Sequence, residues 1–215
     1  MFRLINRCRA LYATSLSGKS HFIIHRNVDI SIHKKAKITI EHDSLLKIGY
    51  PLPNGTPRPT YKRSVLVLDE NAQLVVRGDV FIADGFFIKI GKNGKLIFEG
   101  GNWLAHNATI ICNDEMYFGR HASISWNVTL IDDDRRSFYT VDMKPVSKKR
   151  HPLILGACAG IQMNVVIPKG VTVGKNSLVG ANTVLRQDVA NNCLVYQNPE
   201  IRIKNNVTTG LQNLL

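Results

Sequence analysis

Apolar residues recur every six positions along the C-terminal part of the chain. From Leu155 onward the sequence divides into six consecutive blocks: LGACAG, IQMNVV, IPKGVT, VGKNSL, VGANTV and LRQDVA. Each block starts with a large aliphatic residue and has a small or β-branched residue at its fifth position. Between these positions lie Gly, Asn and Asp, which tolerate the positive φ of tight corners. The period predicts a β-helix in which each block forms one short strand and one corner.

The geometry of such a helix explains the choice of residues. Three blocks complete one triangular coil, so a coil of about 18 residues is expected. The aliphatic first position points into the coil and stacks on its equivalent in the next coil. The fifth position has to be small because it lies near the crowded corner. Parallel stacking then pairs the internal backbone groups with the coils on either side.

The same period recurs upstream, with interruptions. Inward-facing positions are predicted at Ile32, Ile38, Leu68, Leu74, Val80, Phe86, Phe118, Ile124 and Leu130. Residues 50–64 are rich in Pro and Gly and residues 132–152 have no apolar period, so both are predicted to be extruded loops. We therefore expect one all-β domain, with a basic lead segment over residues 1–24, a β-helix over residues 25–190 and a C-terminal cap over residues 191–215.

The lead segment is predicted to contain a short basic helix. Phe2, Ile5, Cys8 and Leu11 recur at about helical spacing, with arginines among them. Such a helix can pack against the domain or a neighbouring subunit, or contact an anionic membrane surface. The segment lacks the continuous apolar core of a signal peptide, and no apolar run is long enough to span a bilayer.

Composition adds a strong bias toward positive charge. The chain has 28 Lys and Arg against 16 Asp and Glu, a net charge of +12. This favours an anionic partner such as a phosphorylated cofactor or an acidic polysaccharide, although a basic surface can also serve solubility alone. Nucleic acid is disfavoured because the basic residues are scattered and no series of stacking aromatics accompanies them.

Cysteine and histidine usage narrows the chemistry further. The four cysteines are far apart and form no CxxC pair, which indicates reduced thiols in a cytoplasmic protein. The seven histidines include no pair at ligand spacing within the predicted coils, so no metal site is expected. No motif for a nucleotide-binding phosphate loop is present either.

Two segments carry a resemblance to a known family. IPKGVTVGKNSLVGANTVLRQDV (residues 167–189) and NPEIRIK (residues 198–204) resemble the hexapeptide-repeat acyltransferases, and in particular the O-acetyltransferases of bacterial capsular and surface polysaccharides. ISWNVTLIDDD is similar to the block before the active-site loop in that group, and the likeness covers roughly residues 25–205. The resemblance implies a left-handed β-helix, a homotrimer, and acetyl-CoA bound in a groove between subunits.

The sequence departs from the family pattern at two positions. A histidine that acts as general base commonly follows the acidic run, whereas Arg136 stands there in this chain. Arginine stays protonated and cannot accept the proton of a sugar hydroxyl. Relatives also often carry a tryptophan in the first clean block, where this chain has Gly160. These two changes keep open a non-catalytic alternative, a hexapeptide-repeat scaffold or binding protein.

If the chain is an enzyme, another residue has to supply the base. His121 is one candidate, because coils of about 18 residues would place it one coil from the root of the 132–152 loop, on about the same edge. His151, at the end of that loop, is the other candidate. Asp134, in the acidic run, could orient a histidine, although the run could equally form surface ion pairs with the arginines that follow it.

A donor site is expected in the C-terminal coils. The resemblance implies that the CoA phosphates lie near basic residues there, and that small residues let the pantetheine arm approach the backbone. The candidate CoA-binding residues are Gly180, Ala181, Lys169, Lys175, Arg186, Arg202 and Lys204. The alternative is that these residues form an ordinary basic rim.

The function expected from the sequence is therefore acyl transfer from acetyl-CoA to a hydroxyl of a bacterial surface or capsular polysaccharide sugar. An acidic glycan acceptor would suit the basic surface. A cytoplasmic location is expected, with the N-terminal helix as a candidate contact to the inner face of the membrane.

Overall fold

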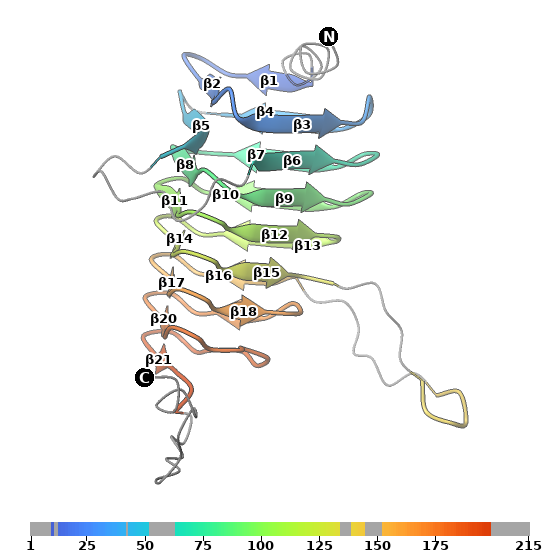
Figure 1. Cartoon of the computed structure of the whole chain (residues 1–215), viewed down its shortest axis with the longest axis vertical. Coiled ribbons are helices and arrows are strands. Elements are labelled where there is room, and N and C mark those ends of the chain that lie inside the picture. Colours follow the sequence, from blue (N-terminus) through green and yellow to red (C-terminus); the bar gives the residue numbers. More distant parts are fainter. Residues whose placement is uncertain are drawn as a thin grey trace, which may run out of the picture.

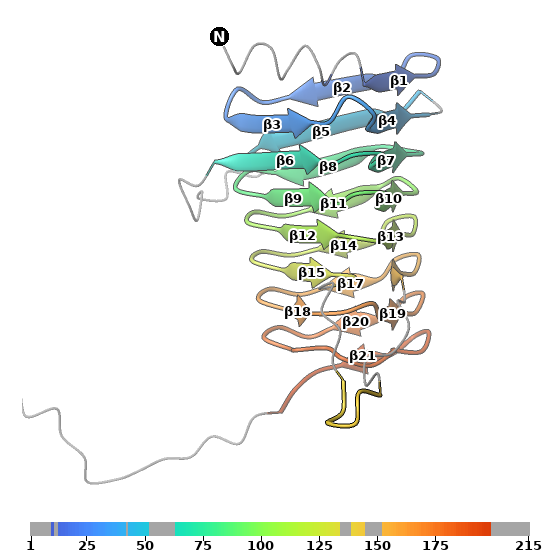
Figure 2. The ribbon, with the colours of Figure 1, turned by 90° about the vertical axis from the view of Figure 1, so that its right-hand side faces the viewer.

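The computed structural model describes residues 10, 13–41, 43–51, 63–133, 139–144 and 152–198. In this part of the chain, strands of three parallel sheets alternate along the sequence, so that each turn takes one strand from each sheet. The turns stack along one axis as triangular coils (Figures 1 and 2). The predicted fold is confirmed: the chain is a left-handed parallel β-helix.

The three sheets are named A, B and C. Sheet A consists of β1 (Thr14–Leu16), β4 (Lys37–Ile40), β7 (Gln73–Val76), β10 (Lys95–Phe98), β13 (Glu115–Phe118), β16 (Leu153–Leu155) and β19 (Thr172–Val173). Sheet B consists of β2 (His21–Ile24), β5 (Leu45–Tyr50), β8 (Val80–Ala83), β11 (Asn102–Leu104), β14 (Ser123–Ile124), β17 (Gly160–Ile161), β20 (Leu178–Val179) and β21 (Leu194–Val195). Sheet C consists of β3 (Val28–Ile32), β6 (Ser64–Leu68), β9 (Phe87–Ile90), β12 (Thr109–Cys112), β15 (Thr129–Ile131) and β18 (Val166–Ile167).

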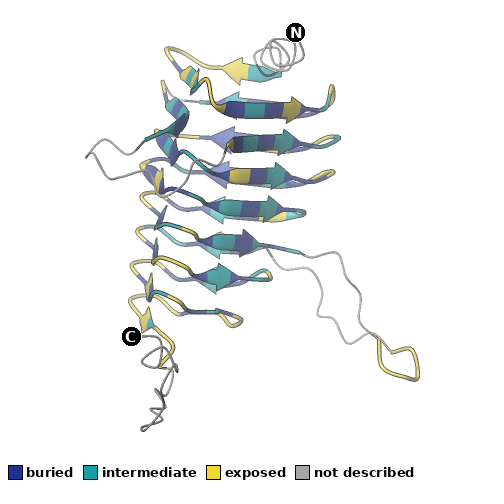
Figure 3. Cartoon of the chain, viewed as in Figure 1, coloured by how far each residue is buried: buried dark blue, intermediate teal, exposed yellow. Residues whose placement is uncertain are grey.

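The six-residue period describes the core correctly. All first and fifth positions of the six C-terminal blocks are buried, and so are the inward-facing positions predicted upstream. Leu155 pairs with Val173 and Ile161 with Val179, as expected for coils of three blocks. Figure 3 shows the resulting pattern, with buried residues along the strands and exposed residues at the corners.

The coils become shorter along the chain, which the sequence period did not predict. Ile88 of β9 pairs with Ile110 of β12, and Ile110 pairs with Leu130 of β15. Both of these coils are therefore longer than three blocks, the first by more than the second. Coils of three blocks begin only after the 132–152 loop. The wider coils enclose larger side chains, and the buried phenylalanines Phe86, Phe98 and Phe118 all lie in this upstream half.

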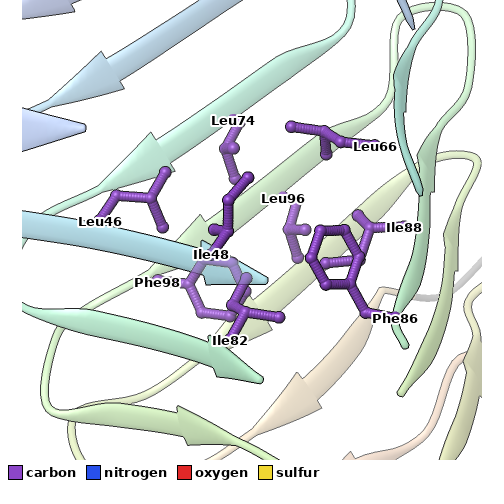
Figure 4. A pocket seen from close by; sticks show the side chains of 9 residues that line it. All are labelled: Leu46, Ile48, Leu66, Leu74, Ile82, Phe86, Ile88, Leu96 and Phe98. Atoms are coloured by element: carbon purple, nitrogen blue, oxygen red, sulfur yellow. The ribbon is translucent and has the colours of Figure 1, made fainter. Parts of the chain in front are cut away.

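An apolar space lies inside the upstream coils. Figure 4 shows the side chains that line it: Leu46, Ile48, Leu66, Leu74, Ile82, Phe86, Ile88, Leu96 and Phe98. These side chains carry no polar atom that could orient a ligand, so the space is a feature of core packing rather than a binding site.

Asparagines occupy many of the corners. Eight of them have positive φ: Asn71, Asn93, Asn107, Asn127, Asn164, Asn176, Asn182 and Asn192. At the corner between sheets B and C, the side-chain amides of Asn107, Asn127 and Asn164 donate to Oδ1 of Asn127, Asn164 and Asn182 at 2.9, 3.1 and 3.0 Å. Asparagine tolerates the left-handed conformation better than other non-glycine residues, and its amide links successive coils.

The ends of the β-helix extend beyond the expected limits. β1 and β2 lie within the segment expected to lead into the helix, and they pair with β4 and β5. β21 continues sheet B past residue 190. The predicted N-terminal helix and most of the predicted cap lie outside the described residues. No helix in the described part of the chain is long and apolar enough to cross a membrane.

Candidate active site at the corner between sheets A and B

His121 lies at an exposed corner, where the chain passes from β13 of sheet A to β14 of sheet B. Its φ is 59°, in the left-handed region that few non-glycine residues adopt. The equivalent residues of the following coils are Cys158, Asn176 and Asn192, with φ of 58°, 56° and 60°. Two of these three are asparagines, so a histidine is unusual at this corner. Because left-handed φ is the regular corner geometry of this β-helix, the side chain of His121 rather than its φ distinguishes this corner.

Gly101 makes room for the His121 ring on the preceding coil. The backbone N–H of His121 donates to the carbonyl of Gly100 at 2.9 Å, which joins the two corners. A Cβ on Gly101 would meet Nδ1 of His121 and would lie 2.5 Å from its Cε1. Gly101 also has a φ of 64°. The glycine is therefore needed twice, for its own backbone conformation and for the imidazole that lies over it.

Asn102 fixes both corners from the inside. Its side chain is buried, its Oδ1 accepts the N–H of Gly100 at 2.9 Å, and its Nδ2 donates to the carbonyls of Gly119 and Ala122 at 2.8 and 2.9 Å. A buried polar side chain with its hydrogen bonds satisfied holds its surroundings in one arrangement. Asn102 thereby positions the turn that carries His121.

Two basic side chains and a thiol lie at the same corner as His121. Arg120, Cys158 and Lys175 are all exposed at this corner, on the same coil and on the two that follow. Residues 119–122, 156–159, 174–177 and 190–193, which form the corner in these four coils, include no carboxylate. These four coils are therefore suited to an anionic ligand at this corner, whereas the preceding coil carries Glu99, which is ion-paired with Arg77 at 2.6 Å.

The acidic run begins at a different corner, between sheets C and A. Asp132 is buried, and its carboxylate accepts the backbone N–H groups of Asn113, Asp114 and Asp133 at 2.7, 2.8 and 2.7 Å. Burial raises the pKa of this carboxyl, and the three N–H donors act against the rise. The backbone carbonyl of Asp132 also accepts the N–H of Gly170 at 2.8 Å. Asp132 is thus a structural residue that closes the corner where the loop begins.

The sequence prediction that His121 shares an edge with the loop root is wrong. His121 lies on the coil formed by β13, β14 and β15, which leads directly into the loop, and it is at another corner of the triangle. The prediction assumed coils of three six-residue blocks, whereas the strand pairing shows that the coils before the loop are longer. Asp134, Arg136 and His151 lie outside the described residues, as do Arg202 and Lys204.

The described CoA-binding candidates are distributed over three corners. Lys175 shares the corner of His121, Lys169 and Arg186 lie between sheets C and A, and Gly180 and Ala181 lie between sheets B and C. One chain therefore does not gather them into a single patch.

Gly180 lies against the following coil. It is buried, its N–H donates to the carbonyl of Val195 at 2.7 Å, and a Cβ there would lie 2.9 Å from the Cβ of Tyr196. The next coil therefore packs against this part of the backbone. Within the described ranges, no group of three or more His, Cys, Asp or Glu side chains could hold a metal ion.

The sequence reasoning missed Gly101, Asn102 and the stacked pair Phe81 and Trp103 of sheet B. These residues lie in the longer upstream coils, where the six-residue count does not show which positions are neighbours. The sequence signal for these residues is the GGNW stretch, in which two glycines and an asparagine precede a tryptophan.

Several acetyltransferases are similar to this chain in sequence. No family model matches the chain. The chain is 28% identical over 144 residues to the galactoside O-acetyltransferase of Escherichia coli K12, covering 66% of the chain and 68% of the relative. It is 24% identical over 152 residues to the putative colanic acid biosynthesis acetyltransferase WcaF of the same organism, covering 64% and 80%. The chain is a homologue of the hexapeptide-repeat acetyltransferases.

The length covered differs among these acetyltransferase homologues. The bifunctional protein GlmU of Methanococcus maripaludis is 25% identical over 197 residues, which is 87% of the chain but 46% of GlmU. The chain thus spans about half the length of that relative. Among solved structures, the polySia specific acetyltransferase NeuO aligns over 94% of the chain and 87% of its own, with 14% identity and a TM-score of 0.33.

Proposed function

We propose that the protein transfers an acetyl group from acetyl-CoA to a sugar hydroxyl of a bacterial surface or capsular polysaccharide, with His121 as the general base. The observation that carries the proposal is the placement of His121, which is exposed in a left-handed corner, lies over Gly101 and is positioned by the buried Asn102. Acetyltransferase homologues, including one named for colanic acid, support the reaction class and a sugar acceptor.

In this mechanism the imidazole of His121 takes the proton of the acceptor hydroxyl as its oxygen attacks the thioester carbonyl carbon. The tetrahedral intermediate collapses, the carbon–sulfur bond breaks, and the CoA sulfur receives the proton from the imidazolium. The products are the O-acetyl sugar and CoA with a free thiol. The base is then regenerated, and Arg136 is not required to accept a proton.

For the donor, Lys175 is the first candidate because it shares the corner of His121, two coils further along the axis. The coils are spaced by roughly 4.8 Å, so its ammonium can serve a phosphate of a CoA molecule whose thioester lies at His121. The remaining candidates, Lys169, Arg186, Arg202, Lys204, Gly180 and Ala181, belong to other corners or lie outside the described residues. A homotrimer with its CoA groove between subunits would bring corners of two chains together.

A non-catalytic scaffold is the second candidate function, and two observations favour it. Arg136 stands where the base is expected, and Gly160 stands where relatives often have tryptophan. A scaffold would keep the β-helix and bind a partner without turnover.

The deciding experiment combines calorimetry of acetyl-CoA binding with a thiol assay of CoA release in the presence and absence of acidic polysaccharide. The proposal predicts micromolar acetyl-CoA binding and polysaccharide-dependent CoA release. No heat at millimolar acetyl-CoA together with no release would overturn the proposal in favour of the scaffold.

A further inference from the structure

The outward-facing side chains of sheet B form a row with one residue per coil. The paired residues are Lys47, Phe81, Trp103, Ser123, Gly160 and Leu178, from β5, β8, β11, β14, β17 and β20. Two large rings are followed by two of the smallest side chains, so the height of the surface drops between Trp103 and Ser123. We call Phe81, Trp103 and Ser123 the sheet B platform.

One face of the Trp103 indole is covered by Phe81, and the residues that follow Trp103 in the row are small. The Phe81 ring stacks on Trp103 with a centroid distance of 4.6 Å and an interplanar angle of 26°. On the opposite side the row continues with Ser123 and Gly160, which are too short to cover an indole. Trp103 is 40% exposed as a result. A rigid, pre-stacked ring with an open face is a typical anchor for a ligand ring.

The platform adjoins the candidate base. Gly101, over which the His121 ring lies, is two residues before Trp103 on the same coil. Two residues of extended chain separate their Cα atoms by roughly 7 Å. Ser123 likewise follows His121 by two residues. The open face of the indole, the Ser123 hydroxyl and the imidazole therefore surround one small region of the surface.

The chemistry of this region favours a sugar ring over the adenine of CoA. The C–H face of a pyranose stacks on an indole, while its hydroxyls can bond to Ser123 and His121. Adenine and thiol lie at opposite ends of CoA, so adenine stacked on Trp103 would carry the thioester away from His121. Charge favours an acidic sugar on the side of His121, where Arg120 is exposed. Lys47 Nζ lies at the other end of the platform, 5.9 Å from the Phe81 centroid and 4.5 Å from the Tyr50 centroid.

We propose that Trp103 binds the pyranose ring of an acidic glycan and presents one of its hydroxyls to His121. The assignment of that glycan as the acceptor rests on the proposed function, whereas binding of the glycan to Trp103 can be measured without turnover.

The test uses an array of printed bacterial surface oligosaccharides, colanic acid fragments included, probed with labelled full-length chain. Wild type and W126F, which alters the other tryptophan of the chain, are expected to bind at least one acidic oligosaccharide equally. W103A is expected to bind it at least tenfold more weakly, and W103F, which keeps a ring, within about threefold of wild type. Calorimetry of W103A with CoA is expected to give an affinity within twofold of wild type.

Several results would overturn the proposal. Binding of wild type to no printed glycan, or undiminished glycan binding by a folded W103A, would remove Trp103 from the acceptor site. Loss of CoA affinity in W103A would place the Trp103 indole in the CoA-binding site. Loss of self-association of W103A in sedimentation would place the indole in a subunit interface. Glycan binding that depends on Trp103 in a protein without transferase activity would preserve this inference while the proposed function fails.

Discussion

Two corners of the β-helix are built in opposite ways. At the corner between sheets C and A, the polar residue Asp132 is buried and its carboxylate accepts three backbone N–H groups. At the corner between sheets A and B, the buried residue is the neutral Asn102 and the ionisable residue His121 faces solvent. The most conspicuous acidic run of the sequence therefore begins with a structural residue, while the less conspicuous histidine is the one available for chemistry.

The largest effect is expected from D132A. The substitution leaves the N–H groups of Asn113, Asp114 and Asp133 without their acceptor, so the free energy of unfolding should fall by about 3 kcal/mol. Urea unfolding measures this loss, with D132N as the matched variant that keeps one acceptor oxygen and loses less. Turnover per folded molecule should stay within about threefold. A stable D132A with no turnover would show that Asp132 serves the chemistry instead.

N102A should affect both stability and activity, in contrast to D132A. It removes three hydrogen bonds and should lower the free energy of unfolding by about 2 kcal/mol. Because Asn102 positions the turn of His121, turnover per folded molecule should also fall about tenfold. The rate is to be measured at a temperature where the variant is folded. Unchanged turnover in folded N102A would break the proposed link between the buried amide and His121.

G101A separates backbone strain from displacement of the ring. Alanine at positive φ should cost about 1 kcal/mol of stability, and its Cβ should push the imidazole away and lower turnover about tenfold. G101N is the control, since asparagine tolerates this φ but also carries a Cβ. We expect G101N to regain much of the stability and little of the turnover. Full turnover in G101N would mean that the space over Gly101 is irrelevant to the reaction.

The smallest effect concerns Glu70, at the corner between β6 and β7. Its carboxylate lies 2.6 Å from Nζ of Lys35 and 2.7 Å from Nζ of Lys92, and these partners lower its pKa from 4.5 to about 2. Because the pKa in the folded state lies below the ordinary value, the stabilising contribution exists above pH 4.5 and is lost as the pH falls toward 2.

E70Q should therefore lower the thermal midpoint at pH 7 by about 1 °C, and by less in high salt. The difference from wild type should shrink as the pH falls below 4.5 and disappear once the pH is below the folded-state pKa of about 2. E115Q, at an exposed residue of β13, is the control and should match wild type at both pH values. A difference between E70Q and wild type that persists at low pH would contradict the assigned ion pairs.

The sequence predicted the fold well because the six-residue period is a direct consequence of coil geometry. Burial of Leu155, Ile161 and their equivalents followed from the pattern alone. The neighbours of His121 could not be predicted, because Gly101, Asn102 and Trp103 are brought to it by coils longer than three blocks. Coil length depends on how many residues each corner contains, and a strict count of three blocks per coil places the wrong residues side by side.

The central claim is that His121 is the general base, and the rate of polysaccharide-dependent CoA release by H121N tests it most directly. Asparagine suits the left-handed corner, as Asn176 and Asn192 show, so the variant should unfold like wild type. The account predicts that H121N releases CoA at least 100-fold more slowly than wild type, while H21N, at an exposed histidine of β2, is unaffected. A folded H121N with the wild-type rate would contradict the account.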